Sequence, residues 1–203
     1  MAPPLVGIFV GGKGRRMGGV AKGLLTAPGG GETLVARLAR IVRDAYDEVD
    51  LLLVGTADAY ASHGLPSLAD DPPGVGPIGG LTALLNEGKR RGAPFVLTLA
   101  CDLPYVNAAL LRRLRDFSPA AAAVAARQGT HWQPLCARFD PVAAQPIAHD
   151  LIRGGARSLQ AVLDALGSYA ALGLQEVQFQ HFNFDDDTVP EFLAAEVAPA
   201  ARA

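Results

Sequence analysis

The chain has 203 residues, half of them hydrophobic, and a formal net charge of -2. That length suits one well-filled domain, and the near-neutral charge argues against a generally basic nucleic-acid-binding protein. The two cysteines, Cys101 and Cys136, form neither a disulfide framework nor a zinc pattern, and they fit a reducing cytoplasm. The apolar run near the start is too short for a signal peptide or a membrane span. We therefore expect one cytoplasmic domain over residues 1–203, with neither a membrane nor a nucleic acid as its partner.

The first element is a short strand that ends in a glycine-rich loop. Residues 5–10 are apolar, partly β-branched and followed at once by glycines, which is typical of a buried strand. Glycines let backbone N–H groups approach a polyanion, and the cations of the loop would neutralise its charge. We therefore predict a phosphate cradle here instead of a plain turn between a strand and a helix. Its predicted members are Val10, Gly11, Gly12, Lys13, Gly14, Arg15, Arg16 and Lys22.

Two familiar nucleotide loops do not match this stretch. A Walker A loop needs a Ser or Thr after its Gly-Lys pair, and Gly14 stands there. A dinucleotide fingerprint that starts at Gly12 and Gly14 needs a third glycine where Met17 stands, which disfavours a nicotinamide-dependent oxidoreductase. The loop is therefore a third kind of nucleotide loop.

Helical and strand patterns alternate after the loop. Apolar spacing predicts helices over residues 32–46, 57–63, 78–91 and 107–117, and short apolar runs predict strands over 49–54 and 95–100. Strand, helix and strand in this order indicate right-handed βαβ units. The predicted fold is an α/β fold with an open, mostly parallel sheet.

A second loop rich in glycine and proline leads into the helix over 78–91. Pro77 suits the first helical turn, where its missing N–H costs nothing. Gly79 and Gly80 in this turn cost about 1 kcal/mol each relative to alanine. That cost suggests that a ligand or another backbone segment approaches closely. We favour a binding loop over a plain surface turn.

A carboxylate follows the central strand. Asp102 comes directly after the strand predicted over 95–100, and the carboxyl ends of parallel strands are where open α/β sheets bind ligands. Beside a phosphate cradle, such a carboxylate is suited to hold Mg²⁺. The alternative is that Asp102 caps the helix over 107–117, but Asn107 is better placed for that. We interpret Cys101 as a small buried thiol and not as a nucleophile.

The C-terminal part is less regular. Residues 120–126 and 133–139 are either a hairpin or two separate strands. Helices are expected over 141–153 and 156–166, a late strand over 177–182, and a last helix from 188 or 189 to 197. The Ala- and Pro-rich tail over 194–203 is expected to fray.

Three separated segments resemble those of the molybdenum cofactor guanylyltransferases and their nucleotidyltransferase relatives. They are Gly11-Gly12-x-Gly14-x-Arg16-Met17-Gly18-Gly19-x-x-Lys22-Gly23, Asp70-x-x-Pro-Gly-x-Gly76-Pro77-x-x-Gly80 and Cys101-Asp102-x-Pro104. Two weaker matches are Gln133-Pro134-Leu135 and Gly155-x-Arg157-Ser158-Leu159. Together they run in the family's order from Leu5 to Leu159.

The resemblance implies a three-layer Rossmann-like fold and the transfer of GMP from GTP to molybdopterin, with Mg²⁺ as cofactor and release of pyrophosphate. It implies catalytic roles for Arg16, Lys22 and Asp102, with Asp102 also binding the metal. The implied nucleotide contacts are the cradle residues above together with Asp70, Asp71, Gly76, Pro77 and Gly80. The implied acceptor contacts are Gln133, Arg157, Asn183 and Asp185. Residues 1–105 would then be the nucleotide- and metal-binding half and 106–193 the acceptor-binding half.

Two details bear on the choice of substrates. The pair Gly11-Gly12 resembles the guanylyl branch, whereas cytidylyl relatives tend to have Ala-Gly, so GTP is favoured over CTP. Ala21 stands where the family usually has Asp, and Asp185 stands where an Asn is usual in the segment near the acceptor. The alternatives are a related enzyme that uses CTP or a sugar or polyol phosphate, and a non-catalytic GTP-binding homologue. Contact with other proteins of molybdenum cofactor synthesis would follow from the main interpretation.

Overall fold

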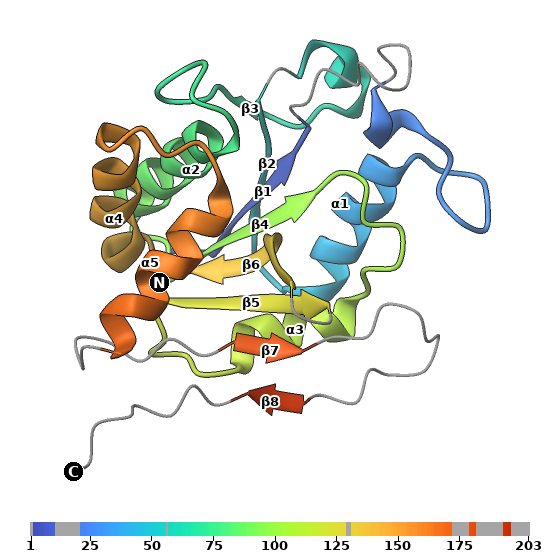
Figure 1. Cartoon of the computed structure of the whole chain (residues 1–203). Helices are drawn as coiled ribbons and strands as arrows, with labels where there is room; N and C mark the ends of the chain where they lie inside the picture. Colours follow the sequence, from blue (N-terminus) through green and yellow to red (C-terminus); the bar gives the residue numbers. More distant parts are fainter. Residues whose placement is uncertain are drawn as a thin grey trace.

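The computed structural model describes residues 2–10, 21–55, 57–128, 131–171, 179–181 and 193–195. Its centre is a six-stranded sheet of order β3-β2-β1-β4-β6-β5 (Figure 1). The strands are β1 Leu5–Phe9, β2 Asp50–Val54, β3 Ser67–Leu68, β4 Val96–Ala100, β5 Ala123–Gln128 and β6 His131–Phe139. Strands β1 to β4 pair in parallel, and β6 runs antiparallel to both β4 and β5. The prediction of a mostly parallel sheet is confirmed, and residues 120–126 and 133–139 prove to be a hairpin.

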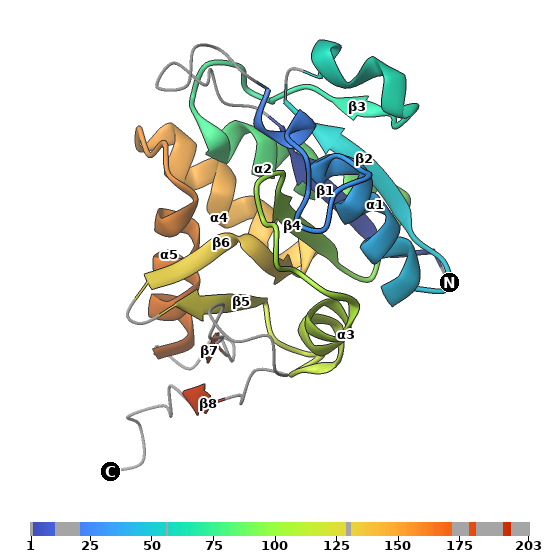
Figure 2. The ribbon, with the colours of Figure 1, turned by 90° about the vertical axis from the view of Figure 1, so that its right-hand side faces the viewer.

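Helices cover both faces of this sheet (Figure 2). They are α1 Leu34–Ala45, α2 Pro77–Arg91, α3 Ala108–Asp116, α4 Pro141–Arg153 and α5 Leu159–Ala171, with short 3-10 helices η2 Lys22–Leu24 and η3 Asp58–His63. Helices α1 and α3 bury their apolar faces in one core, and α2, α4 and α5 bury theirs in the other. The fold is therefore the expected three-layer Rossmann-like arrangement.

Local chemistry explains where these helices begin. The side chains of Thr33, Asn107 and Asp140 accept hydrogen bonds from the first free N–H groups of α1, α3 and α4. Such caps satisfy donors that have no partner inside the helix and contribute about 1 kcal/mol each. Pro77 opens α2, as its fixed φ predicts. Asn107, and not Asp102, therefore caps α3.

A glycine inside β1 lets α2 pack closely on the sheet. A Cβ added to Gly7 would lie 2.7 Å from Val54 Cγ2 and 2.8 Å from Leu84 Cδ2. Because cores are packed as densely as crystals, there is no room for that atom. Gly7 therefore serves the packing of the helix, which agrees with its place inside the apolar run.

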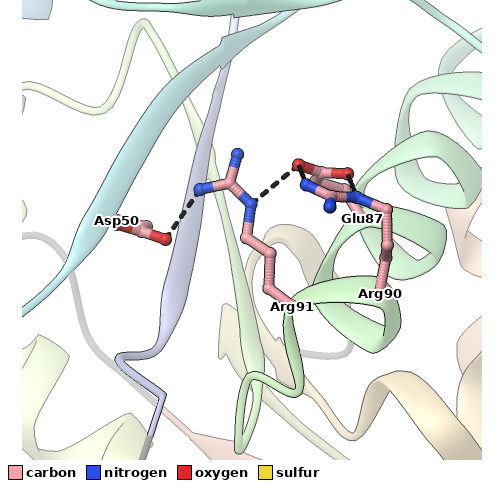
Figure 3. A network of polar contacts seen from close by, with 4 residues as sticks. All are labelled: Asp50, Glu87, Arg90 and Arg91. Atoms are coloured by element: carbon pink, nitrogen blue, oxygen red, sulfur yellow. Dashed lines mark hydrogen bonds and ion pairs between the residues drawn. The ribbon is translucent and has the colours of Figure 1, made fainter.

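The far end of α2 is fixed by charged side chains (Figure 3). Glu87 accepts hydrogen bonds from both Arg90 and Arg91, and Arg91 also reaches Asp50 at the start of β2, 2.7 Å away. The hydrogen bond from Arg90 is the main reason that the pKa of Glu87 falls to about 2. These contacts hold the C-terminus of α2 against β2, while its N-terminus faces the opposite edge of the sheet.

The C-terminal segment differs from expectation. Residues Leu193–Ala195 form a strand, β8, that pairs antiparallel with β7 Phe179–His181. The prediction of a helix there is wrong, although Leu and Ala favour helices, because pairing with β7 satisfies the backbone of this segment. The late strand predicted over 177–182 is confirmed over its central residues. None of the described helices is both long and apolar enough to cross a bilayer.

Candidate nucleotide and metal site

Three strand ends meet where the first loop begins. The registers place Phe9 beside Val54 and beside Ala100. The Val10 amide donates to the Val54 carbonyl at 3.0 Å, and the Cys101 amide donates to the Phe9 carbonyl at 3.2 Å. The start of the first loop and the Asp102 segment therefore emerge side by side at the carboxyl edge of the sheet, the usual ligand edge of such folds.

Lys22 and Asp102 form an ion pair across this edge. The Lys22 ammonium donates to Asp102 Oδ2 at 2.9 Å, although 80 residues separate the two. Their side chains are 45% and 42% exposed, so both groups also face solvent. The hydrogen bond to Asp102, followed by the attraction of its charge, raises the pKa of Lys22, which is therefore protonated at neutral pH. The structure thus joins two residues that the sequence placed in separate motifs.

The carboxylate of Asp102 is of the ligand type that Mg²⁺ binds in proteins. The ion pair uses Oδ2, and the carboxylate remains accessible to solvent. Within the described residues, no group of three or more His, Cys, Asp or Glu side chains could enclose a metal. A site with one carboxylate suits Mg²⁺, which usually keeps several waters and binds substrate phosphates as well as one or two carboxylates. The donors present therefore fit a metal that arrives with a nucleotide.

The second loop packs against its own helix and against the end of β1. A Cβ on Gly79 would lie 2.5 Å from the Pro72 carbonyl oxygen, and one on Gly80 would lie 2.9 Å from Phe9 Cε1 and 3.1 Å from Asp70 Oδ1. The Asp71 amide also donates to the Gly79 carbonyl at 3.1 Å. For Gly79 the close neighbour is a backbone segment, that of the second loop itself, whereas the space beside Gly80 is filled by side chains.

Asp70 is the more enclosed of the two adjacent aspartates. It is half-buried, whereas Asp71 is exposed. Burial raises the pKa of Asp70, and its carboxylate faces Gly80 at the N-terminus of α2. An acceptor of hydrogen bonds is thereby held at the ligand edge, beside the end of β1.

Arg157, predicted to contact the acceptor, lies against the second loop. Its guanidinium donates to the Gly74 carbonyl at 3.1 Å. A Cβ on Gly76 would lie 3.0 Å from the Arg157 carbonyl oxygen, and the φ of Gly76 is +84°. Both the lack of space and the left-handed backbone therefore favour glycine at this position. The segment before α5 therefore braces the loop before α2. Gln133, the other described residue in the acceptor prediction, lies in β6 opposite Ala126.

Several predicted residues lie outside the described part of the chain. They are Gly11, Gly12, Lys13, Gly14, Arg15 and Arg16 of the first loop, and Asn183 and Asp185 near the C-terminus. Their roles stay predictions. Lys22 and Val10, which flank the first loop, are both described.

Tyr60 also belongs to this edge, and no sequence motif singled it out. Its hydroxyl accepts a hydrogen bond from the Gly23 amide at 3.2 Å. The side chain of Cys101 lies nearby and is buried as predicted. Burial raises the pKa of the Cys101 thiol, and the charge of Asp102 adds to this effect, so the thiol is poorly suited to act as a nucleophile.

Comparison with known proteins adds four findings. Residues 6–169 match the MobA-like NTP transferase domain. The molybdenum cofactor guanylyltransferase of Pseudomonas entomophila (strain L48) is 34% identical over 200 residues, which is 95% of this chain and 98% of that protein. Among solved structures, molybdopterin-guanine dinucleotide biosynthesis protein A of Archaeoglobus fulgidus has a TM-score of 0.60 at 23% identity and covers 79% of each chain. A Mycobacterium tuberculosis H37Rv protein crystallised in complex with manganese has a TM-score of 0.59 at 20% identity, over 93% of this chain and 91% of its own.

Proposed function

Because the chain belongs to the MobA-like NTP transferase family, we propose that it is a Mg²⁺-dependent guanylyltransferase that transfers GMP from GTP to molybdopterin and releases pyrophosphate. The observation that carries this proposal is the contact of Lys22 with Asp102 at 2.9 Å on the ligand edge of the sheet. It brings a cation, and the carboxylate that we propose to bind the metal, to the place where the first loop starts.

The charge of the substrates is the main obstacle to this reaction. The acceptor carries a phosphate monoester, whose second pKa is about 6, so it is largely a dianion at neutral pH. It must approach a triphosphate that is itself a polyanion. Lys22 is protonated and half-exposed, which suits it to contact phosphate oxygens. Mg²⁺ held by Asp102 would supply further positive charge to the triphosphate and to the leaving pyrophosphate.

The bond changes need no general base. An oxygen of the acceptor phosphate attacks the α-phosphorus of GTP, and the bond from that phosphorus to the bridging oxygen breaks. Pyrophosphate leaves with the electron pair of the broken bond, and no proton has to be removed from the attacking oxygen. The task of the protein is therefore to hold the groups in line and to offset their charge. Arg16 and the N–H groups of the first loop are proposed to share that task.

We assign the nucleoside to the second loop. Asp70 is half-buried and its carboxylate lies at the N-terminus of α2, where the glycines leave no room for side chains. A carboxylate accepts hydrogen bonds from donors such as the ribose hydroxyls or the N–H groups of guanine. Gly76, Pro77 and Gly80 would form the wall beside it.

We assign the acceptor to the C-terminal half, with contacts from Gln133, Arg157, Asn183 and Asp185. Support for molybdopterin as the acceptor comes from the length of the similarity. The similarity to the guanylyltransferase from Pseudomonas entomophila extends over 95% of this chain, so it includes the C-terminal half. Arg157 connects the two halves through its hydrogen bond to Gly74.

A panel of nucleotides with the purified protein tests this proposal. GTP, CTP, ATP and UTP are each supplied with Mg²⁺, with and without molybdopterin, and pyrophosphate release is recorded. We expect release from GTP only, and only when molybdopterin is present. Release from CTP instead would identify a cytidylyl enzyme, and GTP binding without release would identify a non-catalytic homologue.

A further inference from the structure

Tyr60 lies between the backbone segments that carry Lys22 and Asp102. It lies in η3, and its side chain is only 2% exposed. Its hydroxyl accepts a hydrogen bond from the amide of Gly23, the residue directly after Lys22. Burial, and after it the neighbouring Cys101 side chain, raises the pKa of Tyr60, and Cys101 is the residue directly before Asp102. One buried group therefore bonds to the residue after Lys22 and lies near the residue before Asp102.

The backbone that carries Lys22 is the short 3-10 helix η2, Lys22–Leu24. The Leu25 amide donates to the Lys22 carbonyl at 3.0 Å, and the Leu24 amide donates to the Ala21 carbonyl at 2.9 Å. These bonds close the turn, but they do not attach it to the rest of the protein. The Gly23 amide provides an attachment, because its acceptor belongs to η3, 37 residues away.

Packing makes the same attachment tight. A Cβ added to Gly23 would lie 2.5 Å from Val35 Cγ2 and 2.8 Å from Tyr60 Cε1. Real Cβ atoms do not approach other atoms so closely, so only glycine allows the turn to settle against the Tyr60 ring. The Tyr60 ring limits the position of the turn that carries Lys22 by packing against Gly23. The Tyr60 hydroxyl limits it further through its hydrogen bond with the Gly23 amide.

We propose that Tyr60 is a positioning residue that fixes the Lys22 ammonium relative to Asp102 for guanylyl transfer. This inference rests on the proposed function. Tyr60 acts through Gly23 and does not contact the substrate. A displacement of about 1 Å of a group that stabilises the transition state can cost up to about 100-fold in rate, so the loss of one buried hydroxyl is expected to be visible in turnover.

Tyr46 offers a matched control. Its side chain is 4% exposed, and its hydroxyl also makes one hydrogen bond to the backbone, donating to the Leu111 carbonyl in α3 at 2.9 Å. Both Tyr60→Phe and Tyr46→Phe keep the ring and remove one buried hydrogen bond between a tyrosine hydroxyl and the backbone. The two variants should therefore lose similar stability in thermal unfolding, but only the first lies beside the charged pair.

Steady-state kinetics tests the proposal. We expect Tyr60→Phe to lower kcat about tenfold with the KM for GTP changed by less than about twofold, because an interaction made mainly in the transition state is weakened. Tyr46→Phe should keep the kcat of the unchanged protein. In a Lys22→Ala background, Tyr60→Phe should cause no further loss, since its effect passes through the lysine. An equal fractional loss in both backgrounds, an equal loss in Tyr46→Phe, or no loss in Tyr60→Phe would overturn the inference.

Amide hydrogen exchange of protein labelled with ¹⁵N-glycine gives a readout without substrate. We expect the Gly23 amide to exchange about tenfold faster in Tyr60→Phe, which corresponds to a hydrogen bond of ordinary strength, and at an unchanged rate in Tyr46→Phe. An unchanged Gly23 rate in Tyr60→Phe would contradict the positioning contact. If the unaltered protein transfers no GMP, the proposed function fails, and the exchange data still decide whether Tyr60 holds the turn.

Discussion

Replacing Gly80 by alanine should impair GTP binding more than it impairs stability. The new Cβ would lie 2.9 Å from Phe9 Cε1, 2.9 Å from Val54 Cγ1 and 3.1 Å from Asp70 Oδ1. Overpacking of this kind lowers the free energy of unfolding by about 1–3 kcal/mol. The higher helix propensity of alanine relative to glycine raises it by about 1 kcal/mol. The net loss of stability is therefore about 1 kcal/mol, a fall in Tm of about 2–4 °C for a chain of this size.

The effect on binding should be larger because the Asp70 carboxylate is displaced. A hydrogen bond to a charged group contributes about 1.5–3 kcal/mol, and each 1.4 kcal/mol is tenfold in affinity. Weakening one such bond to the nucleoside predicts a rise of about tenfold in the KM for GTP, measured by pyrophosphate release.

Gly88→Ala is the control for this substitution. Gly88 lies in the same helix, and its new Cβ would overlap the Val96 side chain, away from the second loop. It should lose stability by a similar mechanism and keep the KM for GTP. If the KM rises equally in both variants, or in neither, the reasoning about Asp70 is refuted.

Three further predictions concern charged groups. Asp102→Asn should lower turnover by about 100-fold or more, since a metal contributes several kcal/mol to such reactions, and should leave Tm nearly unchanged, because an exposed ion pair contributes little; unimpaired turnover at saturating Mg²⁺ would exclude the metal role. Arg157→Ala removes the bond to the Gly74 carbonyl and should raise the KM for GTP about threefold to tenfold, whereas an unchanged KM would show that the second loop does not need this support. Glu87 has a folded pKa of about 2 against an ordinary value of 4.5, so its contribution is complete above that ordinary value and is lost as pH falls toward 2. In urea unfolding, Glu87→Gln should therefore be about 1 kcal/mol less stable at neutral pH, after discounting for the exposure of its arginine partners, and the difference should vanish in strong acid; a difference independent of pH would contradict this.

Much of the fold could be predicted because its signals are local. Apolar spacing predicted α1, α2 and α3 to within two residues at each end, and capping chemistry at Thr33 and Asn107 explains where two of them begin. The relation of β5 to β6 could not be decided, since an alanine-rich run has no clear period. The helix predicted near the C-terminus was wrong at Leu193–Ala195, where pairing with β7 overrides helix propensity.

The site was predictable as a set of motifs but not as a set of contacts. Spacing alone indicated that Asp102 follows a central strand, and the structure places it at the carboxyl edge beside the first loop. The contact with Lys22 joins residues 80 positions apart, and no local pattern reports such a distance. Tyr60 was missed for the same reason, because a single aromatic residue in a short 3-10 helix has no periodic partner. Arg157 was expected at the acceptor, and its bond to Gly74 became visible only in three dimensions.

The most direct test of guanylyl transfer follows the two ends of the triphosphate separately. The purified protein is given Mg²⁺, molybdopterin and GTP labelled either at the α-phosphate or at the γ-phosphate, and the products are separated. The proposed reaction predicts that the α-label appears in a molybdopterin–guanine dinucleotide and that the γ-label appears in pyrophosphate in equal amount. Recovery of the α-label only in free GDP, GMP or unreacted GTP would contradict guanylyl transfer by this protein.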